Sequence, residues 1–328
     1  MKKPRIFYHC YDTNVRSGGQ KHTYQHVDVL NAHGFDAYAL HTDCAKRLTW
    51  FRNDTRVIAQ AEFERICDPA TDYLVLPEGL GSQILDYPCR KVIFNKNAFY
   101  GFTAFWGNLT PADPYLHADV VAAFAVSDHN AQHLRFAYPK LNVFRVFSGI
   151  DPARFAYRPI ECKTRQIALI GKAPKQIATL FHMLRARKAI GANTLDDFKW
   201  VLMADLDEEG VARVLQDSLI FVFLNIEEGM PRTLLEALAC GCVPVTYAQG
   251  PLAECLPPGC GVPYGDVVAA ASMLEEIAAA FPHDLAKWRA ITEAGRAIAE
   301  RYSLERQAAS VVEAWQQILT NDSLRLTA

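Results

Sequence analysis

One complete strand–helix–strand unit lies in Leu219-Ile-Phe-Val-Phe-Leu-Asn-Ile-Glu-Glu-Gly-Met-Pro-Arg-Thr-Leu-Leu-Glu-Ala-Leu-Ala-Cys-Gly-Cys-Val-Pro-Val-Thr-Tyr247. Residues 219–224 and 243–247 are apolar runs of strand length without a polar–apolar alternation, which is typical of strands buried on both faces. Between them, Pro231 stands where a helix begins, a position at which its missing N–H costs nothing. A helix between two buried strands predicts a parallel sheet.

The same pattern extends outward to both ends of the chain, because further apolar runs of strand length alternate with helical patterns. Gly34 stands where a helix C-cap is expected, and several of the other strands are separated by helices. Repeated units of this kind predict an α/β protein with doubly wound parallel sheets. The remaining expected strands are 5–10, 36–40, 73–76, 91–94, 120–126, 143–147, 166–170 and 198–203.

The chain divides into two parts at a polar, proline-containing link near 152–162, where the strand and helix pattern starts again. A length of 328 residues also suggests about two domains. We therefore expect Rossmann-like domains at 1–155 and 156–300, with residues 301–328 as a C-terminal helix. In a pair of such domains, a ligand is expected in the cleft that faces the carboxyl ends of both sheets.

Composition and charge exclude several classes of protein. The chain has 34 Lys+Arg against 36 Asp+Glu, a net charge of −2 and a pI near 6.6, which argues against a nucleic-acid binder. Neither a signal peptide nor a run of about 18 apolar residues is present, and nine cysteines without a Cys-x-x-Cys pair indicate free thiols in a reducing compartment. A cytoplasmic protein is expected. The mildly basic first 155 residues, with 17 basic and 15 acidic side chains, leave peripheral contact with the inner membrane open.

The segment before the helix at 231–240 is a candidate anion-binding site. Free N–H groups of Met230, Arg232 and Thr233 at a helix start would favour a phosphate. Glu228 precedes the helix and Glu236 lies within it, and carboxylates of this kind suit the hydroxyl pairs of a sugar or ribose. Taken singly, Glu228 is equally consistent with a carboxylate that stabilises the helix dipole, and Glu236 with a solvated helix position.

Taken together, the stretch resembles the signature of family 4 retaining glycosyltransferases, E-G-[FM]-[GP]-x-x-x-x-E-A-x-A-x-G-x-P-V. The spacing of Glu228 and Glu236, together with Gly229 and Gly241, fits that pattern at once, and Pro244 follows with one residue more than the pattern has. The resemblance implies the GT-B fold, in which two Rossmann-like domains with parallel sheets face each other across a cleft. The first domain would hold the acceptor and the second the nucleotide-sugar donor.

The resemblance also implies roles for individual residues. Glu236 would bind the nucleotide ribose, and Glu228 would face the donor sugar near the reacting carbon. The backbone around Gly229, Met230 and Pro231 would contact sugar hydroxyls, whereas that around Thr233 and Leu234 would contact the diphosphate.

Other segments resemble the family more weakly. Gly18 and Gly19, placed before a helix, are similar to its N-terminal glycine loop, which approaches the donor phosphates or the acceptor. A plain tight turn is the competing interpretation. Residues 125–128 and 146–155 resemble segments at the end of the first domain. Tyr302-Ser-Leu-Glu-Arg306 and the helix after it resemble the C-terminal helix that crosses back to that domain.

Two positions depart from the family pattern. Lys172 takes the place of the usual arginine after the first strand of the second domain, and Lys175 comes early. A lysine can still neutralise a diphosphate, although it lacks the bidentate fork of arginine. Where many members carry a histidine, the sequence has Asn97 or Asn95, which leaves any role of that histidine in doubt. His9, His22, His26, His33 and His41 are interpreted as packed or surface histidines.

The activity implied is transfer of a sugar, with retention, from a nucleotide-diphospho-sugar to a hydroxyl of a saccharide or lipid-linked saccharide, without metal or other cofactor. A catalytically inactive nucleotide-sugar-binding protein of the same fold is one alternative. Another is a metal-dependent GT-A glycosyltransferase that uses Asp205 and Asp207, a pair that also fits a capped helix start. A solute-binding protein lacks its export signal, and a nicotinamide enzyme lacks its G-x-G-x-x-G.

Overall fold

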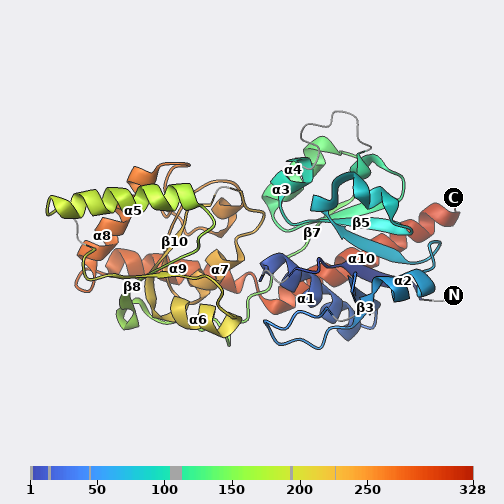
Figure 1. The fold of residues 1–328 in the computed structure, drawn as a ribbon, viewed down its shortest axis with the longest axis horizontal. Helices are drawn as coiled ribbons and strands as arrows, with labels where there is room; N and C mark the ends of the chain where they lie inside the picture. Colours follow the sequence, from blue (N-terminus) through green and yellow to red (C-terminus); the bar gives the residue numbers. More distant parts are fainter. Residues whose placement is uncertain are drawn as a thin grey trace. The chain divides into compact units, whose positions relative to one another are not determined.

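In a computed structural model, the chain forms two compact units. Unit 1 comprises Met1–Ser148 with Glu305–Ala328, and unit 2 comprises Gly149–Leu304 (Figure 1). The structure describes residues 3–13, 16–43, 46–103, 113–192, 195–225 and 227–327, apart from the side chains of 323–327. Each unit is an α/β domain built on its own sheet.

Unit 1 contains a seven-stranded sheet in which all paired strands are parallel. The strand order is β3-β2-β1-β4-β5-β6-β7, so the order reverses beside β1, where ligands bind in folds of this type. The strands are β1 (Arg5–His9), β2 (Asp36–His41), β3 (Val57–Ala59), β4 (Tyr73–Pro77), β5 (Arg90–Asn95), β6 (Val120–Ala125) and β7 (Val143–Arg145).

Helices cover both faces of this sheet. They are α1 (Gly18–Ala32), α2 (Gln60–Ile66), α3 (Ala98–Thr103), α4 (Asp128–Ala137) and α10 (Leu304–Thr327), with the 3₁₀ turns η1 (Glu78–Asp86) and η2 (Pro114–Leu116). On one face, the buried Tyr8 hydroxyl accepts a hydrogen bond from Trp315 of α10 at 2.9 Å and meets His26 of α1 at 3.3 Å. Phe7 points to the other face, where it packs in a core with Phe63 of α2. The C-terminal helix is therefore part of the unit 1 core (Figure 1).

Unit 2 contains a four-stranded parallel sheet in the order β11-β10-β8-β9. Its strands are β8 (Thr164–Leu169), β9 (Lys199–Leu202), β10 (Ser218–Phe223) and β11 (Val243–Thr246). The surrounding helices are α5 (Pro174–Ala189), α6 (Glu208–Asp217), α7 (Arg232–Ala239), α8 (Val267–Ala280) and α9 (Ala286–Glu300), with the 3₁₀ turns η3 (Ile160–Cys162) and η4 (Gly250–Cys255). Strands β8 and β10 are neighbours, so the loops that follow them meet at one edge.

The expected α/β fold with parallel sheets is confirmed, and each expected strand is present, with ends that differ by one or two residues. The short strand β3 was not expected. The expectation that Gly18 and Gly19 form a loop before a helix is wrong. They form the first turn of α1, which is capped by the Ser17 hydroxyl. The division between units falls at 148/149 and 304/305. Among the described residues, no helix is long and apolar enough to cross a membrane.

Candidate active site

The carboxyl edge of the unit 2 sheet holds a buried carboxylate, Glu228, which is 8 % exposed. The Lys172 ammonium donates to Glu228 Oε1 at 2.7 Å, and the Asn225 side-chain amide donates to the same oxygen at 2.9 Å. Lys172 follows β8, whereas Asn225 and Glu228 follow β10. Because β8 and β10 are neighbouring parallel strands, the fold brings these three side chains together.

This pairing makes the buried charge of Glu228 tolerable, because a buried carboxylate needs a counter-ion and hydrogen bonds to offset its lost hydration. The Lys172 side chain is 55 % exposed and its ammonium has three N–H donors, so it can serve Glu228 and a ligand oxygen together. Among the described residues, no N–H group of α7 donates to Glu228. The negative charge of Glu228 is therefore stabilised by Lys172 and Asn225 rather than by hydrogen bonds from the start of α7.

The start of α7 differs in detail from the expected anion site. Pro231 is the N-cap residue, one position before the first helical turn. The expectation of a free Arg232 N–H is wrong, since this group donates to the Met230 carbonyl at 2.9 Å in a tight turn. Among the described residues, the N–H groups of Met230 and Thr233 donate to no backbone carbonyl. These two remain candidates for binding an anion.

Glu236 lies within α7 and is 9 % exposed, so the solvated helix position is not the one observed. Arg232, one turn earlier, interacts electrostatically with Glu236, and its guanidinium donates to the Gly149 carbonyl at 3.4 Å. Burial lowers the pKa of Arg232, and the attraction of Glu236 opposes this shift. Arg232 was not proposed from the sequence, although it is the single cation between residues 225 and 245. A cation at a helix N-terminus is unfavourable by itself, and the attraction of Glu236 offsets this cost.

The other residues implied by the resemblance are distributed around this edge. Gly229, Met230 and Leu234 are buried, and Met230 Sδ lies 3.5 Å from Cys255 Sγ. Lys175 lies in the first turn of α5 and is exposed. In the described part of the chain, no polar contact joins the Lys175 side chain to Glu228 or Lys172. The structure thus brings Lys172, but not Lys175, into contact with Glu228.

The Asp205/Asp207 pair occupies a helix start. The Asp207 carboxylate accepts the Gly210 N–H at 2.8 Å as the N-cap of α6. Among the described residues, no group of three or more His, Cys, Asp or Glu side chains is arranged to hold a metal ion. The two-unit fold contradicts the alternative of a single-domain GT-A enzyme.

Unit 1 carries a second polar cluster at the carboxyl edge of its sheet. Glu78 follows β4, is 4 % exposed, and accepts the backbone N–H groups of Lys96 at 2.9 Å and Asn97 at 2.7 Å. Lys96 follows β5, and its ammonium donates to the Thr23 hydroxyl of α1 at 2.9 Å. A Cβ on Gly19 would lie 3.3 Å from Lys96 Cδ, so the glycine gives the lysine room to reach α1.

Burial shifts the protonation of this cluster. It raises the pKa of Glu78 to about 7, while the Lys96 charge and the N–H bonds from Asn97 and Lys96 oppose the shift. Burial, with a contribution from Lys96, lowers the pKa of His9 at the end of β1 to about 4. Glu78, Lys96 and His9 were not proposed as site residues. The signal was available, since each lies at or directly after the carboxyl end of a buried strand.

The asparagines after β5 have structural partners. Asn97 accepts the Phe99 N–H at 2.9 Å through its side-chain oxygen, at the start of α3. Asn95 is fully buried and its amide donates to the Tyr115 hydroxyl at 3.1 Å, while Asn130 donates to its side-chain oxygen. Both side chains therefore support the loop that carries Lys96.

A change of Glu78 to Gln is expected to alter the pH dependence of unit 1 stability. The pKa of Glu78 is raised on folding, so its contribution is fully present below its unfolded value of about 4.5 and is lost as the pH rises through about 7. Between pH 5 and pH 7.5, the free energy of unfolding of the wild type should fall by about 2–3 kcal/mol relative to the variant. Urea unfolding at both pH values measures this difference, and parallel pH profiles for the two proteins would contradict the assignment.

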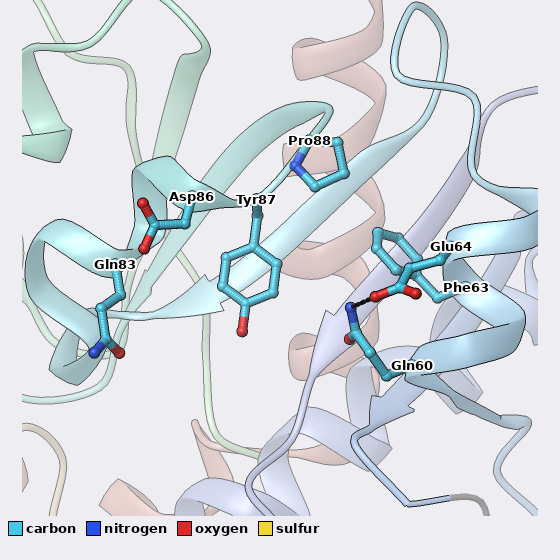
Figure 2. Close-up of a pocket in the computed structure, with 7 residues that line it drawn as sticks. All are labelled: Gln60, Phe63, Glu64, Gln83, Asp86, Tyr87 and Pro88. Atoms are coloured by element: carbon cyan, nitrogen blue, oxygen red, sulfur yellow. Dashed lines mark hydrogen bonds between the residues drawn. The ribbon is translucent and has the colours of Figure 1, made fainter.

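A hollow of about 350 Å³ lies elsewhere in unit 1, between α2 and the end of η1 (Figure 2). Figure 2 shows two carboxylates on its walls, Glu64 and Asp86, with the Tyr87 ring between the walls, and Gln60 donates to Glu64 at 2.9 Å. Since its charged lining is entirely acidic, this hollow does not suit an anionic ligand.

Comparisons with known proteins agree with this fold. A sucrose-phosphate synthase from Thermosynechococcus elongatus superposes with a TM-score of 0.70 at 14 % identity, covering 97 % of this chain and 100 % of that one. A glycosyltransferase from Rickettsia africae gives 0.65 at 16 % identity, with 98 % and 100 % covered. The Anabaena protein HepE, solved with UDP and glucose, gives 0.67 at 11 % identity, with 96 % and 100 % covered. No curated protein sequence matches the chain.

The fold is therefore that of the GT-B glycosyltransferases. In the sequence, residues 158–281 match the family model of glycosyl transferases group 1. That segment contains Lys172, Glu228 and Glu236 together. Over these residues the resemblance to group 1 glycosyltransferases is confirmed, whereas the assignment to family 4 stays a prediction.

Proposed function

We propose that this protein is a retaining glycosyltransferase that moves a sugar from a nucleotide-diphospho-sugar to a hydroxyl of a saccharide or lipid-linked saccharide. The observation that carries the proposal is the pairing of buried Glu228 with Lys172, beside the start of α7. The family match to residues 158–281 supports the transfer reaction, and HepE was solved with UDP and glucose. The proposal places the enzyme in the cytoplasm, with peripheral membrane contact when the acceptor is lipid-linked.

In the proposed reaction, different residues act on the departing diphosphate and on the donor sugar. As the anomeric carbon becomes cation-like, the departing diphosphate gathers negative charge, which fixed cations and N–H dipoles stabilise. Lys172 and the N–H groups of Met230 and Thr233 would supply that stabilisation, with Arg232 and Lys175 as further cations. Glu228 would hold the Lys172 ammonium and face the donor sugar. The acceptor hydroxyl would attack from the face that the diphosphate leaves, and a donor phosphate oxygen would take its proton.

A transfer assay distinguishes this enzyme from an inactive nucleotide-sugar binder. The protein is incubated with a panel of labelled nucleotide sugars and mixed saccharide acceptors, and both nucleotide release and labelled product are followed. Product with the anomeric configuration of the donor supports a retaining enzyme. Thermal stabilisation by one nucleotide sugar, without any release of nucleotide, would instead support the binding protein.

Replacement of Glu236 with Ala is expected to weaken nucleotide binding. If the buried carboxylate accepts hydrogen bonds from the ribose hydroxyls, its loss should cost about 1–3 kcal/mol, or about 5- to 150-fold in Kd. Calorimetric titration of the free nucleotides measures this effect. Glu293, an exposed carboxylate of α9, provides a control variant, Glu293→Ala, that should bind as the wild type does. Unchanged affinity of Glu236→Ala for every nucleotide would contradict the ribose role.

Activity is expected to survive chelation. The donor diphosphate is proposed to be neutralised by Lys172, Lys175 and N–H groups, so EDTA should leave the rate unchanged. Lys172→Ala and Lys175→Ala should each lower turnover. Asp207→Asn should cost little, because asparagine is an equally good N-cap for α6. An enzyme silenced by EDTA, restored by Mn²⁺ and insensitive to the lysine changes would contradict this assignment.

A further inference from the structure

A second hollow of unit 1, about 220 Å³ in volume, lies at the carboxyl ends of β1 and β2. Its lining comes from Tyr11–Thr13 and Arg16 after β1 and from Lys46–Trp50 after β2, with His41 at the end of β2. The carboxyl edge is the side of an open parallel sheet at which ligands bind. The hollow lies in unit 1, whereas the residues that resemble the donor signature lie in unit 2.

The charged lining of this hollow is mostly cationic. Among the described residues that line it, three are cationic, namely Arg16, Lys46 and Arg47, and one, Asp12, is a carboxylate. Asp12 is already engaged, because it accepts hydrogen bonds from His41 Nδ1 at 2.7 Å and from the Asp43 N–H at 3.1 Å. The local charge is therefore positive, which favours an anion in a chain whose net charge is negative.

One of the three cations, Arg47, is held in place by contacts within the chain. The Arg47 guanidinium donates to the Asn53 side-chain oxygen at 3.0 Å and to the Thr55 carbonyl at 2.7 Å. A guanidinium has five N–H donors, so others remain for a ligand. A fixed cation loses little side-chain entropy when it binds, which favours affinity.

The aromatic lining points to a sugar rather than to a simple ion. Tyr11 and Trp50 both line the hollow. A sugar presents an apolar C–H face that packs against such rings, together with polar oxygens for the charged side chains.

From this lining we infer that the hollow binds an anionic acceptor sugar, one that carries a phosphate ester or a carboxylate. The inference rests on the proposed function, in which unit 1 holds the acceptor. A volume of about 220 Å³ suits one sugar ring or its anionic group. It is below the roughly 300 Å³ at which sites for larger ligands begin, which disfavours a whole nucleotide sugar.

The test measures binding of matched neutral and anionic sugars to the full chain. The probes are glucose, glucose 6-phosphate and glucuronate, with the corresponding mannose and galactose compounds. Their binding is measured by calorimetry and by tryptophan fluorescence. At least one anionic sugar should bind about tenfold or more tightly than its neutral counterpart, since a charge-assisted contact is added. Comparison of the phosphate and carboxylate series identifies which anion is preferred.

Variants locate the site. Lys46→Gln keeps a polar side chain that is one bond shorter but removes its charge, and should weaken binding of the anionic sugar about tenfold while leaving its neutral counterpart unaffected. Trp50→Phe should weaken both and abolish the fluorescence change. Lys140→Gln, which alters an exposed lysine of unit 1 outside the hollow, is the matched control and should behave as the wild type.

The outcomes separate this inference from the proposed function. Equal binding of neutral and anionic sugars, or identical behaviour of Lys46→Gln and Lys140→Gln, would overturn the inference. Release of nucleotide from the donor in the absence of any acceptor sugar tests the donor residues of unit 2. If this release is observed although the inference fails, the proposed glycosyltransferase function still stands. Anionic sugar binding without donor cleavage by any nucleotide sugar would instead count against the proposed function.

Discussion

Changing Glu228 to Gln is expected to lower kcat on the order of 100- to 1,000-fold, with little change in affinity for the free nucleotide. Glu228 is buried, bonded to Lys172 and Asn225, and proposed to act on the sugar side of the donor. Glutamine preserves the shape and can still accept the Asn225 hydrogen bond, so the change removes mainly the charge. Steady-state kinetics, together with calorimetric titration of the nucleotide, separate an effect on the transition state from one on binding.

A double-mutant cycle tests whether Glu228 and Lys172 act as a unit. If they do, the variant with both Glu228→Gln and Lys172→Met should be no slower than the slower single variant. Glu227, the exposed neighbouring carboxylate, supplies the control, and Glu227→Gln should keep most of the activity. Additive losses for the Glu228–Lys172 pair, or equal losses in nucleotide affinity and turnover for Glu228→Gln, would contradict a joint role in the transition state.

Replacing Gly241 with Ala is expected to destabilise unit 2 by about 3 kcal/mol or more. Gly241 has φ +81°, and a Cβ added there would lie 2.6 Å from the Arg158 carbonyl oxygen. The obstructing atom is backbone and is held nearby, since the Arg158 N–H donates to the Cys240 carbonyl at 3.2 Å. The same carbonyl accepts from the buried Lys163 ammonium at 2.6 Å, so neither segment can retreat easily. Chemical denaturation of the two proteins measures the loss.

Gly259→Ala is the matched control for this prediction. Gly259 also has positive φ, at +74°, but a Cβ there would meet nothing within 4 Å. Only backbone strain should remain, at about 1–2 kcal/mol. If the two variants were equally stable, the close approach of residue 158 would not be the reason for a glycine at position 241.

The sequence by itself determined the α/β class, the parallel sheets and the order of the elements. Apolar runs such as 219–224 and 120–126 lack alternation because both faces of the strand are covered, and this signal is local. The sequence also predicts that Glu228 lies before a helix and Glu236 within it. A strand ends just before Glu228, and seven residues separate the two carboxylates. The Ser-Gly-Gly segment at 17–19 predicts a loop, since glycine disfavours helices, but the Ser17 cap and the packing of α1 outweigh that preference.

Only the tertiary structure decided which side chains meet. Lys172 and Glu228 are 56 residues apart, and they pair because β8 and β10 are neighbours in the sheet order β11-β10-β8-β9. Glu78 and Lys96 meet at the carboxyl edge of the unit 1 sheet because β4 and β5 are neighbours there. Burial at this edge raises the pKa of Glu78, which composition cannot reveal. The cationic hollow joins loops that follow β1 and β2. In each case the contact depends on strand order and on exclusion of water, which are properties of the packed sheet and not of any local segment.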